Sequence, residues 1–160
     1  MGIVIKHINN NLEICLDVIR KSFMTVANDF NLNKQNAPTN PAFIELKHLI
    51  QMDRKGVAMF GAFLEGICIG FVGIEKAKEG TYWLEKLAVL PEYRHKGYGK
   101  ALIDFVFDYV KDHHGERVSI GIIDEHLVLK NWYLSYGFKE VEKKVFDHLP
   151  FAVCFMIKDI

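Results

Sequence analysis

The segment RHKGYG, residues 94–99, combines three basic side chains with two glycines at the start of an expected helix. The first N–H groups of a helix have no intrahelical acceptor, and they point outward with the positive end of the helix dipole. Glycine has no β-carbon, so a phosphate can approach its backbone closely. The segment therefore predicts a phosphate or pyrophosphate site. It fits neither a Rossmann fingerprint, which would need glycine at Leu102, nor a Walker loop, and two glycines alone also fit a plain turn with solvated basic residues.

A candidate catalytic carboxylate, Glu85, precedes this turn in the apolar stretch 81–90, which has the composition of a strand. Strict alternation places five side chains on one strand face: Thr81, Trp83, Glu85, Leu87 and Val89. A carboxyl group among apolar neighbours has a raised pKa, which suits a general base that takes a proton from an ammonium group directly or through water. The alternative is a structural role, in which Glu85 pairs with a lysine or arginine on the sheet face.

The remaining elements alternate between strands and helices along the chain. Strands are expected at residues 3–8, 81–90, 118–123, 138–146 and 151–158, and as a hairpin over 57–77 that turns at Glu65-Gly66. Helices are expected at 11–27, 41–52, 98–112 and 126–136, with an Asn-rich loop over 28–41. The helix at 98–112 is expected to bury Tyr98, Leu102, Phe105, Val106 and Tyr109. This order predicts a mixed sheet with helices on both faces.

Length and composition indicate one domain over residues 1–160, with half of the residues hydrophobic. Twenty basic and twenty acidic residues give no net charge, which argues against nucleic acid as a partner. No apolar run approaches the length of a membrane span, and no signal peptide is visible, so we expect a cytoplasmic protein without a membrane partner. The three cysteines are distant from one another and predict buried thiols rather than disulfides or a metal site. Asp124 and Glu125 are expected to cap the helix that follows them.

Two motifs resemble the signature of the GNAT superfamily, the acyl-CoA-dependent N-acyltransferases. The pattern [RQ]-x-x-G-x-[GA] occurs after a strand at residues 94–99, within LAVLPEYRHKGYGKALI, and Y-x-x-x-G-F occurs at 133–138. The resemblance covers residues 57–140. It implies the GNAT fold, an α/β (mixed α+β) architecture with a central, mostly antiparallel seven-stranded sheet flanked by about four helices. It also implies acetyl-CoA as co-substrate and no metal.

The resemblance assigns roles to individual residues. Backbone amides from Arg94 to Gly99 would hold the CoA pyrophosphate. The cofactor-binding residues of this segment are Arg94, His95, Lys96, Gly97, Tyr98, Gly99 and Lys100. The strand at 81–90 would splay from the strand at 118–123, and the pantetheine arm would pair with main-chain groups of Leu87, Ala88 and Val89. One of these N–H groups would stabilise the oxyanion, and Tyr133 would protonate the leaving thiolate.

His126 marks a departure from the family pattern, because many relatives carry asparagine seven residues before the motif tyrosine. Seven residues return a side chain to the same helical face. His126 is therefore a candidate for contact with the pantetheine or for help in proton transfer. The alternative is a partly exposed residue at the start of a helix.

The function implied is transfer of an acetyl group to a primary amine of a small molecule by direct attack, since no activated nucleophile stands out. Glu85 and Tyr133 are the expected base and acid. The alternative is a domain that binds CoA but serves as a sensor or scaffold. The acceptor would be chosen by residues 22–42 and 145–152, and a homodimer is compatible with splayed strands and exposed sheet edges.

Overall fold

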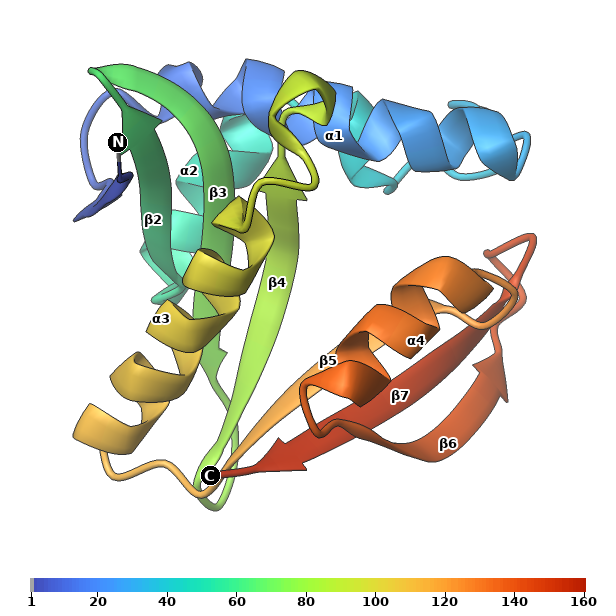
Figure 1. Cartoon of the computed structure of the whole chain (residues 1–160). Helices are drawn as coiled ribbons and strands as arrows, with labels where there is room; N and C mark the ends of the chain where they lie inside the picture. The colour runs from blue at the N-terminus through green and yellow to red at the C-terminus, as the bar shows by residue number, and fades with distance from the viewer. Residues whose placement is uncertain (1) are drawn as a thin grey trace.

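The computed structural model describes residues 2–160, in which a seven-stranded sheet is flanked by four α-helices (Figure 1). The strand order is β1-β2-β3-β4-β5-β7-β6. The strands are β1 Val4–His7, β2 Ala58–Leu64, β3 Ile67–Lys76, β4 Thr81–Val89, β5 Arg117–Ile123, β6 Lys139–Val145 and β7 Ala152–Asp159. Within the described residues β4 and β5 are the only parallel neighbours. The expected mixed, mostly antiparallel sheet is therefore confirmed.

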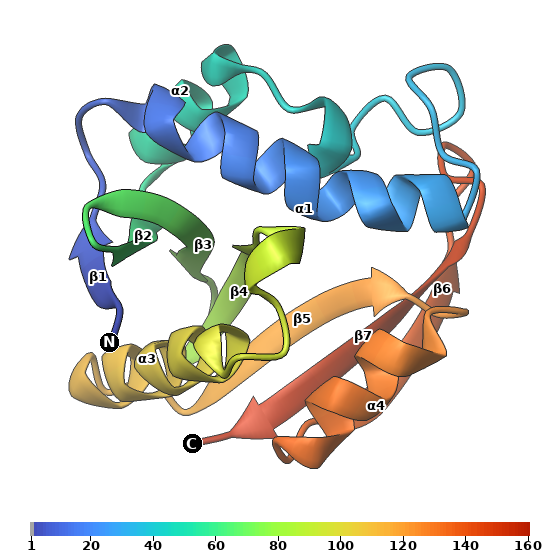
Figure 2. The ribbon, with the colours of Figure 1, turned by 45° about the horizontal axis from the view of Figure 1, so that its top comes forward.

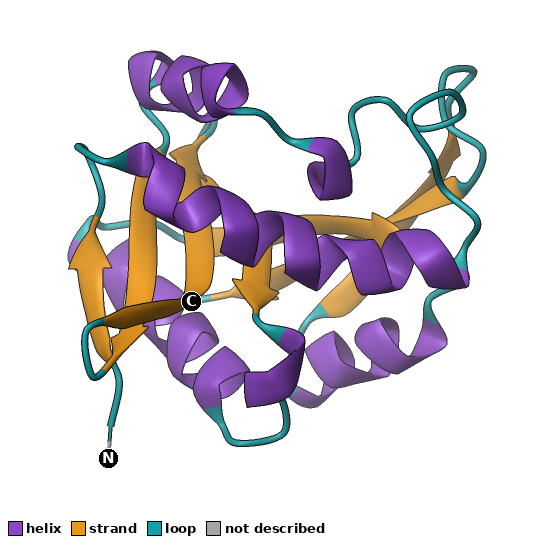
Figure 3. Cartoon of the chain, turned by 90° about the horizontal axis from the view of Figure 1, so that it is seen from above, coloured by secondary structure: helices purple, strands orange, loops and turns teal. Residues whose placement is uncertain are grey.

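The helices cover the two faces of the sheet, as the view from above shows (Figure 3). The α-helices are α1 Leu16–Asp29, α2 Leu46–Lys55, α3 Tyr98–Asp112 and α4 Leu127–Ser135, and the 3-10 turns are η1 Leu12–Cys15, η2 Pro41–Phe43 and η3 Pro91–Tyr93. α1 and α2 pack on one face of the β1–β4 half, while α3 packs on the other. α4 lies on the same side as α3, against β5 and β7. Nowhere in residues 2–160 does a helix combine the length and the apolar character that crossing a membrane requires.

The buried face of α3 differs from the expected one by part of a turn. Its fully buried residues are Leu102, Ile103, Val106 and Val110, whereas Phe105 and Tyr109 are only partly buried. These two rings lie at the flank of the helix, where both contact Phe60 of β2. The aliphatic side chains take the centre because they fill the narrow space between helix and sheet, and the larger rings cover its edge.

Local chemistry explains most element boundaries. The β2–β3 hairpin turns at Glu65 and Gly66, which both have positive φ, as a two-residue hairpin turn of the favoured hand requires. The first helix begins as the 3-10 turn η1, and the second begins at Leu46 rather than at Pro41. Pro41 opens only the short η2, because the chain is extended again at Ile44, and Glu45 then caps α2.

The loop between α1 and η2 is held by its own asparagines. Asn33 accepts hydrogen bonds from the N–H groups of Gln35 and Asn36, and the Asn36 amide donates to the carbonyl of Asn31. Leu32 and Ala37 of this loop are buried, in a cluster that also contains Ile123 at the end of β5 and Phe151 before β7. The loop therefore packs across the gap between the two halves of the molecule.

Candidate active site

A bulge at Lys86 changes the direction of the β4 side chains. Lys86 has φ +54°, and the pairing of β4 with β3 shifts register at this point, from Glu85–Gly73 to Ala88–Phe71. An inserted residue reverses the alternation of the side chains that follow it. The expectation that Leu87 and Val89 share a face with Glu85 is therefore wrong. Both pack in the core on the α3 side, whereas Glu85 lies on the side of α1 and α2, with Ala88 buried there.

Beyond its first three residues β4 separates from β5. The parallel pairing covers only Thr81–Trp83 against Arg117–Ser119, and the two strands then diverge (Figure 2). Because the N–H of Leu90 donates to the carbonyl of Ile69 in β3, the N–H of Val89 points the opposite way, into this opening. The expected splay is present, and it leaves one backbone edge of β4 free to pair with an extended ligand.

The turn that follows β4 presents a run of free backbone donors. Within residues 2–160 none of the six N–H groups of residues 95–100 donates a hydrogen bond to the protein, and no side chain caps α3. Gly97 has φ +87°, and an added β-carbon would meet nothing within 4 Å. Gly99 differs, because a β-carbon there would come within 3.3 Å of the Trp132 ring. Gly97 thus leaves room for an anion, while Gly99 allows α4 to pack close to α3.

The basic residues of this turn have different surroundings. Arg94 does not face the turn: its guanidinium donates to the Ser22 carbonyl (2.9 Å), the Ser22 hydroxyl (3.2 Å) and the Thr25 hydroxyl (3.1 Å), all on α1. Its own N–H donates to the carbonyl of Pro91. The free backbone donors of the motif therefore begin at His95. Arg94 instead links α1 to the turn through its side chain. His95 and Lys96 are exposed, and the Lys100 ammonium pairs with Asp104 at 2.7 Å.

Glu85 shares a hydrogen bond with Glu75 of β3, and both side chains are mostly shielded from solvent. Burial, followed by this hydrogen bond, raises the pKa of Glu85 to about 7. The same hydrogen bond lowers the pKa of Glu75, with help from the ammonium of Lys55. Lys86 opposes the rise at Glu85, but its ammonium lies 4.0 Å away. Glu85 is therefore the carboxyl group that holds a proton at mildly acidic pH and releases it near neutrality.

Tyr133 is buried on α4, with its ring edge-on to Trp132 and Phe138. Burial raises the pKa of its phenol, and no hydrogen bond contributes to that shift. In the described part of the chain every fully buried side-chain nitrogen or oxygen has a partner. Because the Tyr133 hydroxyl has no hydrogen-bond partner among these residues, it is not fully buried. A phenol in this position stays protonated and can donate.

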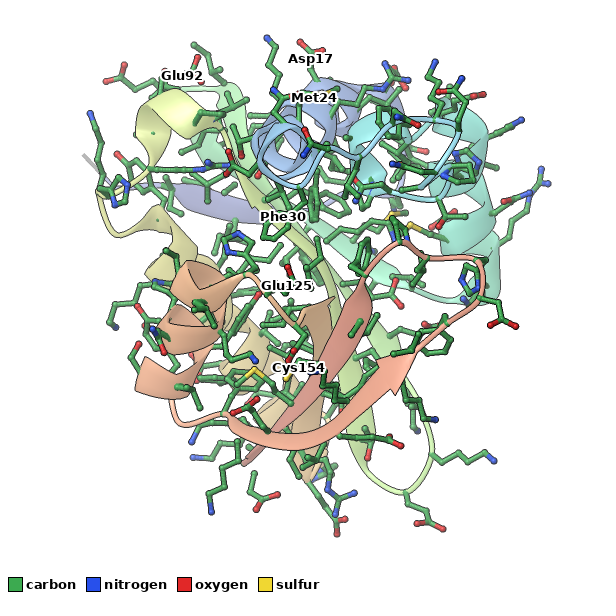
Figure 4. The ribbon with its side chains drawn as sticks, turned by 90° about the vertical axis from the view of Figure 1, so that its right-hand side faces the viewer. Asp17, Met24, Phe30, Glu92, Glu125 and Cys154 are labelled. Atoms are coloured by element: carbon green, nitrogen blue, oxygen red, sulfur yellow. The ribbon has the colours of Figure 1, made fainter. Side chains whose placement is uncertain are left out.

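His126 caps α4 and faces α1. Its Nδ1 accepts the N–H of Leu129 at 3.3 Å, and its ring lies 5.5 Å from that of Phe30. Burial lowers the pKa of His126, so the ring is neutral and its Nε2 carries the remaining proton. Figure 4 shows Phe30 below α1 and just above Glu125, which precedes His126 in the chain. His126 therefore lies between the start of α4 and the end of α1, and its Nε2 has no acceptor among residues 2–160.

Asp124 does not cap α4, in contrast to the expectation. Its carboxylate pairs with Lys130 at 2.7 Å and with Lys143 at 2.9 Å, and Lys130 also contacts Glu140 at 3.2 Å. Two lysines attract Asp124 more strongly than a helix end, and they lower its pKa. Asp124, Glu140 and Cys154 lie close enough to hold a cation, but the Lys130 ammonium already neutralises the cluster.

Comparison with known proteins identifies the architecture. Residues 22–138 match the Acetyltransferase (GNAT) family. The chain belongs to the GNAT acetyltransferase family. Streptothricin acetyltransferase A of Bacillus subtilis (strain 168) is 27% identical over 103 residues, which are 63% of this chain and 60% of that protein. The chain thus matches less than two thirds of the length of this curated relative.

Solved structures of acetyltransferases share the fold of this GNAT chain over its whole length. PaiA N-acetyltransferase from Thermoplasma acidophilum, in complex with coenzyme A, superposes with a TM-score of 0.78 at 20% identity and covers 100% of both chains. A probable acetyltransferase from Staphylococcus epidermidis ATCC 12228 gives 0.77 at 17% identity over 98% of each chain. At these identities the likeness concerns the fold.

Two pairs of residues at this candidate site of the GNAT chain were not identified from the sequence. Glu75 and Lys55 surround Glu85, but the contact depends on the β3–β4 register and on the place where α2 ends. Ser22 and Thr25 hold Arg94 across 72 and 69 residues of chain. A helical period places Ser22 and Thr25 on one face of α1, but no local signal names their partner.

Proposed function

We propose that the protein transfers the acetyl group of acetyl-CoA to a primary amine of a small molecule by direct attack. One observation carries the proposal, and it concerns the break in β4, the bulge at Lys86 where this strand has separated from β5. Free backbone donors at residues 95–100 follow the break at the start of α3, and Glu85, whose pKa is raised to about 7, precedes it on the α1 and α2 face. A donor that enters from the α3 side and an amine that enters from the α1 side would meet at this break. Membership of the GNAT family supports the same reaction class.

The free backbone groups suit the acyl donor, which supplies an acetyl group activated as a thioester. The six N–H groups of residues 95–100 provide donors for the pyrophosphate, and the open space at Gly97 lets it approach. The unpaired edge of β4 provides main-chain partners for the amide groups of the pantetheine arm. The N–H of Val89 is a candidate donor to the thioester oxygen, where negative charge develops during attack.

Glu85 and Tyr133 suit the two proton transfers. Glu85 is ionised above about pH 7 and then accepts a proton from the bound ammonium, which frees the amine lone pair. Tyr133 keeps its proton at any physiological pH and donates it to the departing thiolate. A covalent route finds less support, because Cys15 and Cys154 are buried with raised pKa values. Cys68, whose pKa is lowered, faces a separate groove between α1 and β3.

Aromatic side chains on the α1 side of the break suit a small acceptor. Phe30, Phe43 and Phe151 contribute to the cluster formed by the α1–η2 loop, and Trp83 packs edge-on against Phe155 on the sheet face that also carries Glu85. Trp83 pairs with Glu75 across the sheet, and an aromatic ring beside carboxylates suits an amine with an apolar or cationic body. The name of the curated relative, Streptothricin acetyltransferase A, refers to a small-molecule acceptor and supports this class.

Product formation with a panel of amines tests the proposal. The purified protein is incubated with acetyl-CoA and one amine at a time, and CoA and the acetylated amine are quantified by mass spectrometry. We expect stoichiometric CoA and acetyl-amine with at least one small primary amine, and no CoA release without an amine. Binding of acetyl-CoA with no turnover on any amine would favour a sensor or scaffold instead.

A further inference from the structure

Glu75 and Glu85 form a carboxyl pair that the sheet register creates. Glu75 opposes Trp83, and Glu85 opposes Gly73, so the two carboxylic side chains are diagonal neighbours on one face of β3 and β4. Gly73 has no side chain to separate them. Their side chains are only 20% and 23% exposed, so water screens the pair weakly. Two carboxylates this close and this shielded favour sharing a proton over carrying two charges.

Two lysines at unequal distances decide which carboxyl group keeps the proton. The ammonium of Lys55, at the end of α2, lies 3.3 Å from Glu75, while that of Lys86, on β4, lies 4.0 Å from Glu85. The charged groups that face Glu85 are thus Lys55 from α2, Glu75 from β3 and Lys86 from its own strand. The nearer lysine holds Glu75 in its ionised form. The proton of the pair therefore resides on Glu85.

We propose that Glu75, anchored by Lys55, is a positioning residue that sets the protonation of the general base Glu85. The inference rests on the proposed function, because it names the partner of the base proposed there. Glu75 accepts the hydrogen bond of protonated Glu85, which orients that carboxyl group below the break in β4. When an ammonium group binds and Glu85 has released its own proton, the pair carries two negative charges. One N–H proton then passes to Glu85, the nitrogen retains its lone pair, and Glu75 again accepts the hydrogen bond.

Because Glu75 and Lys55 carry opposite charges, removing each of them should change the pKa of Glu85 in opposite directions. Removal of the Glu75 charge in Glu75→Gln lowers the pKa of Glu85, because the like charge is lost and the glutamine amide N–H can donate to the ionised Glu85 carboxylate. Removal of the Lys55 charge in Lys55→Met raises it, because an attractive cation is lost. Lys47→Met is the matched control on the same helix, since Lys47 pairs with Glu45 at 3.7 Å and does not contact the carboxyl pair.

Two measurements on the full-length protein detect these changes in the pKa of Glu85. Carbon-13 NMR of the glutamate carboxyl groups follows the titration of Glu85, whose signal is assigned by its absence in Glu85→Gln. The pH dependence of kcat/KM for the best amine of the panel follows the free enzyme's base. We expect both midpoints to fall by on the order of one pH unit in Glu75→Gln and to rise in Lys55→Met. Lys47→Met should match the wild type.

The two measurements separate the possible failures. If the Glu85 carboxyl titrates at the same pH in the wild type, in Glu75→Gln and in Lys55→Met, the inference is overturned, whatever the rates show. If the carboxyl titration shifts while the rate profile stays in place, the pair is coupled but Glu85 is not the base, and the proposed role of Glu85 fails. If Glu75→Gln does not fold, Lys55→Met alone decides, because its expected shift has the opposite sign.

Discussion

Tyr133 combines a ring held between two aromatic neighbours with a hydroxyl group that is not fully buried. Tyr133→Phe removes only the hydroxyl, so the ring still packs and the fold should be kept. A positioned acid contributes about 10²–10⁴-fold, so we expect kcat to fall within that range while acetyl-CoA affinity is unchanged. Steady-state kinetics and calorimetric titration measure the two quantities.

Tyr136 is the control for this prediction. It lies three residues further along the chain, at the end of α4, where its ring contacts Trp132. Tyr136→Phe should leave kcat nearly unchanged, because no reacting atom is expected near its hydroxyl. Equal losses in the two variants, or a loss confined to Tyr136→Phe, would show that the acid is placed wrongly.

Glu85 has a pKa near the pH at which most assays are run, which makes its charge easy to test. In the wild type kcat/KM should rise as the pH increases through about 7, because only the ionised carboxylate accepts a proton. Glu85→Gln should remove this rise and lower the rate most above pH 7, with acetyl-CoA affinity retained. A pH–rate profile of unchanged shape and height would leave Glu85 a structural role only.

At the scale of elements, the turn between β4 and α3 depends on the backbone of Gly97. Gly97→Val places a branched side chain at φ +87°, in space that is otherwise open. The side chain strains the turn and occupies the approach of the pyrophosphate, so we expect acetyl-CoA affinity to fall at least tenfold in a protein that still folds. Isothermal titration calorimetry gives the affinity, and circular dichroism confirms the fold.

Gly56 provides a matched control for the strain alone. It ends α2 with φ +96°, and a β-carbon there would also meet nothing within 4 Å. Gly56→Val should therefore cost a similar free energy of unfolding without any loss of acetyl-CoA affinity. Should both variants bind as the wild type does, the turn would not be the pyrophosphate site.

At the scale of the whole molecule, the raised pKa of Glu85 makes stability depend on pH. Its ordinary value is 4.5, and its value in the folded protein is about 7, so between these pH values the folded state binds more protons than the unfolded state. The free energy of unfolding must then fall as pH rises through this window. The lowered pKa of Glu75 acts in the opposite sense, but below its ordinary value of 4.5 and thus outside the window.

Urea denaturation at pH 5 and pH 8 measures this dependence. We expect the wild type to lose on the order of 1–2 kcal/mol more than Glu85→Gln between the two pH values, after allowance for solvent screening. Glu85→Gln should also be more stable than the wild type at pH 8, because it buries no charge. Parallel losses in the two proteins would mean that Glu85 titrates at its ordinary pKa.

The sequence by itself determined the features that depend on neighbouring residues. The bounds of α3, the hairpin at Glu65-Gly66 and the glycine-rich turn before α3 follow from periodicity, from the conformational freedom of glycine and from unsatisfied helix ends. The two GNAT motifs predicted the fold, because the motif at 94–99 marks the turn before α3 and the motif at 133–138 marks the end of α4. Both elements have fixed positions in the fold of the family.

Only the tertiary structure decided which distant groups meet. The bulge at Lys86 reversed the faces of β4, because its position depends on the register with β3 and not on any property of Lys86 itself. The insertion of β7 between β5 and β6 likewise follows from pairing across the sheet. Contacts such as Glu75 with Glu85, or Arg94 with Ser22, join segments on different elements, and side-chain spacing along one element carries no information about them.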